Sequence, residues 1–210
     1  MRVDPTLMEL PSLSSNPFEI RPLSIGQAQD LIGRDEIVIE CREHLISGSP
    51  RMVIVSGVRG SGRTSLLNAI ASQSSDPFIS DYWPLDDDPV KSMVTQVAAH
   101  FLGHNLPSVI SETISRLSQE LDTRDGPIPL VAFDLPYNVE VSMVIPRLVQ
   151  IMQKIRALVL FTMLPNQLSS LEEDTLEVFD PPHTLRNLTQ DEIQILVDKR
   201  IIRVARHRWI

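Results

Sequence analysis

The sequence is poor in several features, and each scarcity limits what the protein can be. Its one cysteine, Cys41, has no partner for a disulfide within the chain, so we expect a reducing compartment and a packing role for this thiol. No apolar run reaches the roughly 20 residues that cross a bilayer, and residues 1–22 lack the charged-then-apolar order of a signal peptide. We therefore expect a cytoplasmic protein that makes no membrane contact.

Positive charge is also in deficit. The formal net charge of −8 argues against a broadly basic surface that binds nucleic acid without sequence preference, and leaves only a local basic patch open. Lysine is rarest, because the chain has three lysines and 16 arginines. An arginine where lysine is usual can therefore reflect a general bias of this chain, and does not by itself indicate a lost activity.

Residues 51–71, RMVIVSGVRGSGRTSLLNAIA, carry the strongest local pattern in the sequence. Met52–Val55 is an apolar run with three β-branched residues, as expected of a strand buried on both faces. The next segment, Ser56–Gly62, is rich in glycine, which lets backbone N–H groups come close to an anion. Apolar residues then recur at helical spacing from Arg63 onward, which predicts a helix whose N-terminus favours negative charge.

This segment matches the phosphate-binding pattern GxxxxGK[ST] at every position except Arg63, where lysine is expected. A guanidinium keeps the positive charge but is planar and larger than an ammonium. We predict that nine residues bind the phosphates of a nucleotide: Gly57, Val58, Arg59, Gly60, Ser61, Gly62, Arg63, Thr64 and Ser65. The alternative is a glycine- and serine-rich loop that joins a strand to a helix and binds nothing.

Two later strands end in polar residues. Leu130–Asp134 is an apolar run that ends in an acid, which predicts that Asp134 holds Mg²⁺ opposite the Thr64 hydroxyl. The residue after it is Leu135, so the glutamate that many ATPases use for hydrolysis is not at this position. The polar Thr162 ends the run 157–162, where it either senses the γ-phosphate through water or only ends the strand, and both readings stay open.

Five predicted strands alternate with helices, which indicates an α/β fold with a parallel sheet covered on both faces. The strands are expected at residues 52–55, 78–82, 130–134, 157–162 and 184–186. We divide the chain into an extended N-terminal arm (1–23), a P-loop NTPase core (24–188) and a C-terminal basic helix (189–210). That helix opens on the capping box Thr189–Glu192 and carries arginines that suit its dipole or form a small docking surface.

Four segments resemble AAA+ and STAND-type ATPases, especially the ATPase core of origin-recognition-class replication initiators: residues 16–23, 31–45, the P-loop and 185–201. The resemblance implies a three-layer P-loop NTPase with a central five-stranded parallel sheet, and a C-terminal helical lid truncated to about one helix. It also implies an adenine pocket at Leu31 and Ile32, Asp134 as the Walker B acid, Thr162 as the first sensor, and ATP or ADP with Mg²⁺ as ligands. The Walker motifs are degenerate, with Arg63 for lysine and Leu135 for glutamate.

The leading hypothesis is an ATP-binding protein that acts as a conformational or assembly switch, with weak or no hydrolysis. Its expected partners are an adenine nucleotide and either another protein or a second copy of the chain. The alternative is a degenerate P-loop scaffold that binds a protein partner without nucleotide. A true ATPase that uses an acid from elsewhere is a third reading, and no catalytic residue is assigned.

Overall fold

The computed structural model describes residues 21–80, 84 and 87–206. The chain divides into two compact units, one of residues 22–187 and one of residues 1–21 with 188–210. Most of the expected N-terminal arm, the end of the strand expected at 78–82, and the last arginine of the C-terminal segment, Arg208, lie outside the described residues.

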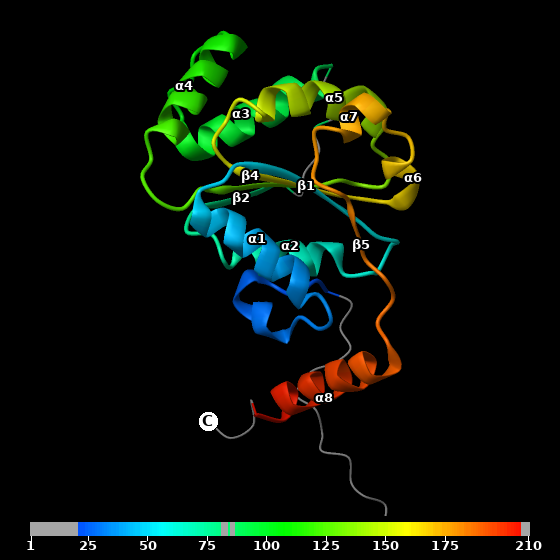
Figure 1. Cartoon of the computed structure of the whole chain (residues 1–210). Coiled ribbons are helices and arrows are strands. Elements are labelled where there is room, and N and C mark those ends of the chain that lie inside the picture. The colour runs from blue at the N-terminus through cyan, green and yellow to red at the C-terminus, as the bar shows by residue number, and fades with distance from the viewer. Residues whose placement is uncertain (1–20, 81–83, 85–86, 207–210) are drawn as a thin grey trace, which may run out of the picture. The chain divides into compact units, whose positions relative to one another are not determined.

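The larger unit is built on a five-stranded sheet in which all the paired strands are parallel. The strand order is β2-β3-β4-β1-β5 (Figure 1). The strands are β1 Arg51–Ser56, β2 Pro77–Ser80, β3 Leu130–Asp134, β4 Leu158–Met163 and β5 His183–Thr184. The predicted α/β fold with a five-stranded parallel sheet is therefore confirmed.

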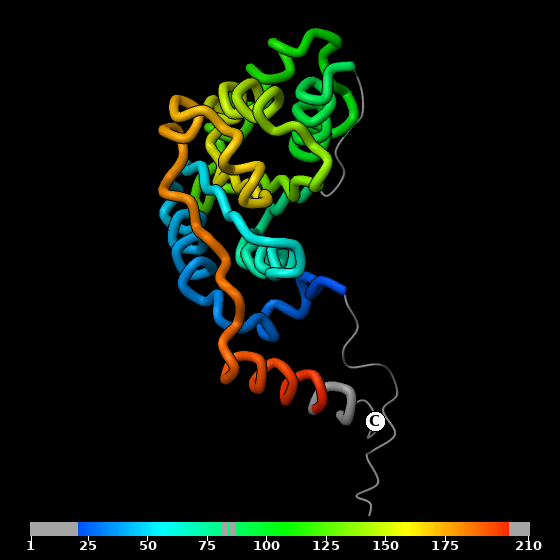
Figure 2. The backbone as a smooth tube through the Cα atoms, turned by 90° about the vertical axis from the view of Figure 1, so that its right-hand side faces the viewer, coloured from blue at the N-terminus to red at the C-terminus, as the bar shows by residue number. Residues whose placement is uncertain are grey.

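Helices cover both faces of this sheet, which gives three layers. Within residues 22–187, α1 and α2 lie on one face, and α3 and α5 on the other, with α4 packed against α3. Figure 2 gives the same layers from the side. The helices are η1 Ile25–Asp30 (a 3-10 helix), α1 Asp35–Ser47, α2 Arg63–Ala71, α3 Pro89–Leu102, α4 Ile110–Asp122, α5 Val141–Met152, α6 Pro165–Leu168 and α7 Glu173–Leu176.

The central strands are apolar throughout because both of their faces are buried. In β1, Met52 and Ile54 pack into the core under α3 and α5, whereas Val53 and Val55 pack into the core under α1 and α2. Phe133 of β3 stacks on Phe161 of β4, with ring centroids 5.0 Å apart. The two cores hold β1, β3 and β4 rigidly, and so fix the sheet edge where these strands end.

Some boundaries differ from the sequence prediction. The strand β5 has two residues and begins at His183, one residue before the expected range 184–186. Helix α5 begins at Val141, so Pro146 lies in its second turn. The short helices α6 and α7 were not predicted, because one-turn helices are too short to show a periodicity.

Helix α8, Gln190–Arg206, belongs to the second unit. The predicted capping box is confirmed, since the Thr189 N–H donates to the Glu192 carboxylate at 2.7 Å and the Glu192 N–H donates to Thr189 Oγ1 at 3.3 Å. Three large apolar side chains of this helix are exposed: Ile193, Ile195 and Ile201. Among the described residues, no helix combines the length and the apolar character needed to span a membrane.

Candidate phosphate-binding site

The parallel register brings the predicted site residues to one edge of the sheet. Thr162 of β4 is the register partner of both Val55 in β1 and Asp134 in β3. Because parallel strands end at the same edge, the loop after β1, the carboxyl end of β3 and the end of β4 are neighbours. This edge is where ligands bind in open α/β sheets.

The loop after β1 is compact and depends on its glycines. A β-carbon at Gly57 would overlap the Ser61 hydroxyl and approach the Leu185 β-carbon at 3.0 Å, so any larger residue would force its neighbours to shift. Gly62 has φ +92° and directly precedes α2, in a left-handed conformation that strains other residues. The loop therefore turns sharply and enters α2 with the first N–H groups of the helix facing the edge of the sheet.

Asp134 stands between two threonines. Thr64 Oγ1 of α2 donates to Asp134 Oδ2 at 2.6 Å, and Thr162 Oγ1 of β4 donates to Asp134 Oδ1. Thr162 is completely buried. The structure thus brings together the two residues expected to hold Mg²⁺ and the residue expected to sense phosphate, and both carboxylate oxygens of Asp134 have a donor.

Two polar groups of the loop are buried without a partner. Arg63 Nη1 and Ser61 Oγ have no hydrogen-bond partner among the residues that the structure describes. Burial lowers the pKa of the Arg63 guanidinium from its usual value, and the nearby Asp134 carboxylate opposes this effect. Arginine remains protonated in proteins, so the Arg63 guanidinium carries a positive charge, and its Nη1 donors are unused.

A cavity of about 240 Å³ is lined by Arg63, the first of these two residues. Its lining comes from the loop after β1, the start of α2, and the loops after β3 and β4: Arg59, Arg63, Thr64, Asp134, Leu135, Pro136, Tyr137 and Leu164. The Arg59 guanidinium lies over the Tyr137 ring, 5.9 Å from its centroid. Sequence reasoning predicted Arg59 as a site residue but missed Pro136, Tyr137 and Leu164, whose loop positions carry no periodic pattern.

The loop after β3 is held in place by Gln167 of α6. This buried amide donates from Nε2 to Pro136 O at 2.7 Å and to Val139 O at 3.2 Å, and accepts from the Leu164 N–H at 2.9 Å. Leu135 is 2% exposed and packs into the core, and its N–H donates to Thr162 O at 3.0 Å. Sequence reasoning missed Gln167, because only its buried position distinguishes it from a surface glutamine.

The residues expected to contact adenine lie outside the cavity that contains Arg63 and Thr64. Leu31 lines a separate cavity of about 440 Å³ between η1, α1 and the C-terminal half of α2, and Ile32 is half-buried. The hydroxyl of Ser65, a residue expected to bind phosphate, accepts a hydrogen bond from the Leu23 N–H at 3.1 Å. Val58 is 52% exposed. The structure therefore does not bring Leu31 into the cavity that contains Arg63 and Thr64.

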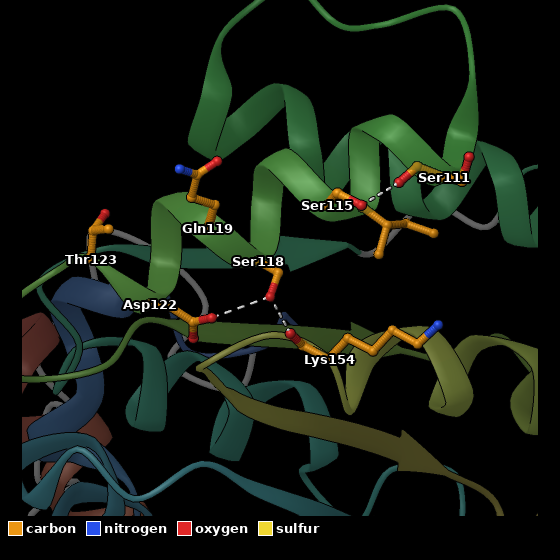
Figure 3. A pocket seen from close by; sticks show the side chains of 8 residues that line it. Ser111, Ser115, Ser118, Gln119, Asp122, Thr123 and Lys154 are labelled. Carbon is orange, nitrogen blue, oxygen red and sulfur yellow. Dashed lines mark hydrogen bonds between the residues drawn. The ribbon is translucent and has the colours of Figure 1, made fainter.

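A larger cavity, of about 600 Å³, lies along α4 (Figure 3). Its polar groups are used within the fold, since Ser118 Oγ donates to Lys154 O at 2.6 Å and to Asp122 at 3.3 Å, and Ser115 Oγ donates to Ser111 O at 2.9 Å. Hydroxyls that bond along their own helix are typical of serine in helices. This cavity gives no sign of a built binding site.

No family model matches the sequence, and no curated protein matches it. The fold is nevertheless similar to solved structures. The ORC1 protein of Aeropyrum pernix, solved in complex with DNA, aligns with a TM-score of 0.58 and 14% identity, over 89% of this chain and 52% of that chain. PCH-2 of C. elegans aligns with a TM-score of 0.54 and 14% identity, over 88% of this chain and 51% of that chain.

This chain thus spans about half the length of the solved chains that it matches. At 14% identity, the similarity concerns the fold alone. The chain therefore shares with these two neighbours a three-layer α/β fold, here with a five-stranded parallel sheet at its centre.

Proposed function

We propose that this protein binds an adenine nucleotide, ATP or ADP, with its phosphates in the cavity at the end of β1, β3 and β4. The observation that carries the proposal is an imbalance between donors and acceptors. Both oxygens of Asp134 already accept hydrogen bonds, whereas Arg63 Nη1 and the Ser61 hydroxyl are buried without partners in the described part of the chain. A site with surplus donors and a buried positive charge selects an anion that is rich in oxygen atoms.

The loop backbone adds to this preference. Gly57–Ser65 leads into the N-terminus of α2, where free N–H groups and the helix dipole attract phosphate. The cavity of about 240 Å³ is small for a whole nucleotide, since ligand pockets usually exceed roughly 300 Å³. We therefore place only the phosphates in it, and propose that the base lies toward Leu31 and Ile32, on the side of the sheet covered by α1 and α2.

The residues present fit Mg²⁺. The Thr64 hydroxyl and the Asp134 carboxylate are adjacent oxygen ligands, and Mg²⁺ is usually bound by one or two carboxylates together with phosphate oxygens and water. When bound, the ion would neutralise charge on the phosphates. Thr64 would then exchange its hydrogen bond to Asp134 for the ion, while Thr162 would keep the carboxylate in place.

We further propose that nucleotide acts as a switch for conformation or assembly, with weak or no hydrolysis. Hydrolysis needs a group that positions and deprotonates water. The residue after Asp134 is a leucine packed in the core, and Asp134 is the only carboxylate among the described residues that line the cavity. The exposed isoleucines of α8 offer a surface for a partner protein or a second copy of the chain.

The second candidate function is a scaffold that binds a protein partner without nucleotide. One observation favours it, namely that the Thr64 hydroxyl is already hydrogen-bonded to the Asp134 carboxylate at 2.6 Å. The ORC1 protein similar in fold was solved with DNA, but the net charge of −8 gives this chain no general attraction to a nucleic acid.

Calorimetric titration with ATP and Mg²⁺ tests the proposal. We expect micromolar binding that Thr64→Ala weakens at least tenfold and that Thr95→Ala leaves unchanged, because Thr95 is an exposed threonine of α3 outside the cavity. No detectable binding to the wild-type chain would favour the scaffold. Steady phosphate release that Asp134→Asn abolishes would instead identify a true ATPase.

A further inference from the structure

A second arginine lines the phosphate cavity, at a position where the P-loop pattern accepts any residue. Arg59 belongs to the loop after β1, and its guanidinium lies over the ring of Tyr137, 5.9 Å from the centroid. Both side chains line the cavity that contains Thr64 and Asp134. An arginine side chain that lines an anion site is a candidate ligand contact, because its planar fork matches the oxygens of a phosphate.

Tyr137 is positioned by its backbone and not by core packing. Its side chain is 72% exposed, whereas the residues on either side of it in the loop are fastened to the buried amide of Gln167. Gln167 donates to Pro136 O at 2.7 Å and to Val139 O at 3.2 Å. The loop therefore presents an aromatic ring at a fixed place beside the cavity, opposite Arg59.

The contact between ring and guanidinium is weak enough to be exchanged. A distance of 5.9 Å is close to the outer limit of about 6 Å for a cation–π contact, and the exposed ring keeps the interaction weak. A phosphate oxygen would compete with it easily, since a charge-assisted hydrogen bond is stronger. The ring thus keeps the Arg59 guanidinium near the cavity and leaves it available to bind a phosphate oxygen.

Arg59 and Tyr137 also lie on the side of the cavity expected to receive the end of the phosphate chain. Tyr137 is on the loop between β3 and α5, and α5 covers the face of the sheet opposite α1 and α2 (Figure 1). Leu31, toward which we place the base, lies beside α1 and α2. A phosphate chain that starts on the α1 side and crosses the loop after β1 ends toward Tyr137.

We propose that Arg59 is a specificity-determining residue that binds the terminal phosphate of a nucleoside triphosphate, and that Tyr137 is a positioning residue that holds its guanidinium at the cavity. This inference rests on the proposed nucleotide binding. The protein then distinguishes triphosphate from diphosphate through a residue of its own chain. A switch that responds to the state of the nucleotide needs this kind of discrimination.

The test is calorimetric titration of the full chain with ADP and with a non-hydrolysable ATP analogue, adenosine 5′-(β,γ-imido)triphosphate, each with Mg²⁺. We expect the wild type to bind the triphosphate more tightly. Arg59→Gln should weaken triphosphate binding about tenfold and ADP binding less than about twofold, because only the triphosphate reaches the guanidinium. The matched control is Arg42→Gln, which removes an exposed arginine of α1 outside the cavity.

Two variants separate the ring from the hydroxyl of Tyr137. Tyr137→Phe should keep the wild-type preference because it keeps the ring, whereas Tyr137→Leu should lose about threefold in triphosphate binding. Equal losses of ADP and triphosphate in Arg59→Gln, or no loss of either, would overturn the inference while nucleotide binding stands. Equal effects of Tyr137→Phe and Tyr137→Leu would overturn the role of the ring. If the wild type binds neither nucleotide, the proposed function fails and this inference fails with it.

Discussion

Replacing Gln167 with methionine is expected to loosen the wall of the phosphate cavity and to destabilise the fold. The side chain is 4% exposed, and its amide makes three hydrogen bonds to the backbone of the loops after β3 and β4. Methionine has nearly the same length and fills the same space. The substitution therefore leaves no cavity, and it avoids the loss of stability that a cavity causes. What remains is the loss of the polar contacts.

The size of the effect follows from the groups left behind. Pro136 O keeps a second donor, the Val139 N–H at 3.3 Å, but the Leu164 N–H and Val139 O lose the partners that Gln167 supplies. An unsatisfied buried backbone group costs about 1–3 kcal/mol, and these loops are near enough to water for the lower values. We therefore expect a loss of about 2–3 kcal/mol in the free energy of unfolding. This corresponds to a melting temperature lower by roughly 4–12 °C for a domain of this size.

Urea unfolding followed by circular dichroism measures this loss directly, as a lower midpoint at unchanged slope. Gln153→Met is the control, because Gln153 is an exposed glutamine at the end of α5 and its substitution should change stability by less than about 0.5 kcal/mol. Gln167→Glu keeps the shape but replaces the N–H donors with acceptors, so at pH 7 it should destabilise at least as much as methionine. A loss below about 0.5 kcal/mol in Gln167→Met would refute the reasoning that this amide holds the two loops.

Two further predictions concern the loop after β1 and the opposite end of the sheet. Gly57→Ala should weaken nucleotide binding, because its β-carbon would overlap the Ser61 hydroxyl and force the loop to shift. Thr95→Ala, at an exposed position of α3 outside the cavity, should bind normally in the same titration, and equal binding by both variants would exclude a tight loop. At Asp76, burial alone would raise the pKa, but hydrogen bonds from Arg124 and His100 and their charges lower it. A depressed pKa stabilises the fold above the unfolded value of about 3.9 and loses this effect as the pH falls through the folded value. Asp76→Asn should therefore lower the urea midpoint at pH 7, and its difference from wild type should narrow below about pH 4; a constant difference would contradict the pKa shift.

The sequence predicted the main layers of the fold because they depend on local patterns. Met52–Val55 is apolar at every position, and Leu130–Asp134 is apolar up to its final aspartate. Strands that are buried on both faces of a parallel sheet require this composition. Parallel strands share an edge for their carboxyl ends, so the proximity of Thr64 and Asp134 follows from topology alone.

Other parts of the site could not be predicted in this way. Gln167 lies on a one-turn helix and Tyr137 on a loop, so neither belongs to a periodic pattern, and each acquires its neighbours only through tertiary packing. Leu31 is a different case. Resemblance assigns it to the base, and this stays a prediction: its cavity includes Ala69 and Gln73 near the C-terminal end of α2, whereas Arg63 begins that helix.

Arg63 illustrates how the structure adds a criterion that composition lacks. The chain has 16 arginines and three lysines, so arginine in place of the P-loop lysine is compatible both with a lost phosphate site and with a retained one. A P-loop that had lost its ligand would gain stability by giving its buried donors new partners, since each unsatisfied donor is costly. Asp134 is fully satisfied, yet Arg63 Nη1 and the Ser61 hydroxyl are not, among the residues that the structure describes. Arg63 also lines the cavity proposed to receive phosphate, so its unsatisfied donors favour a retained phosphate site over a decayed one.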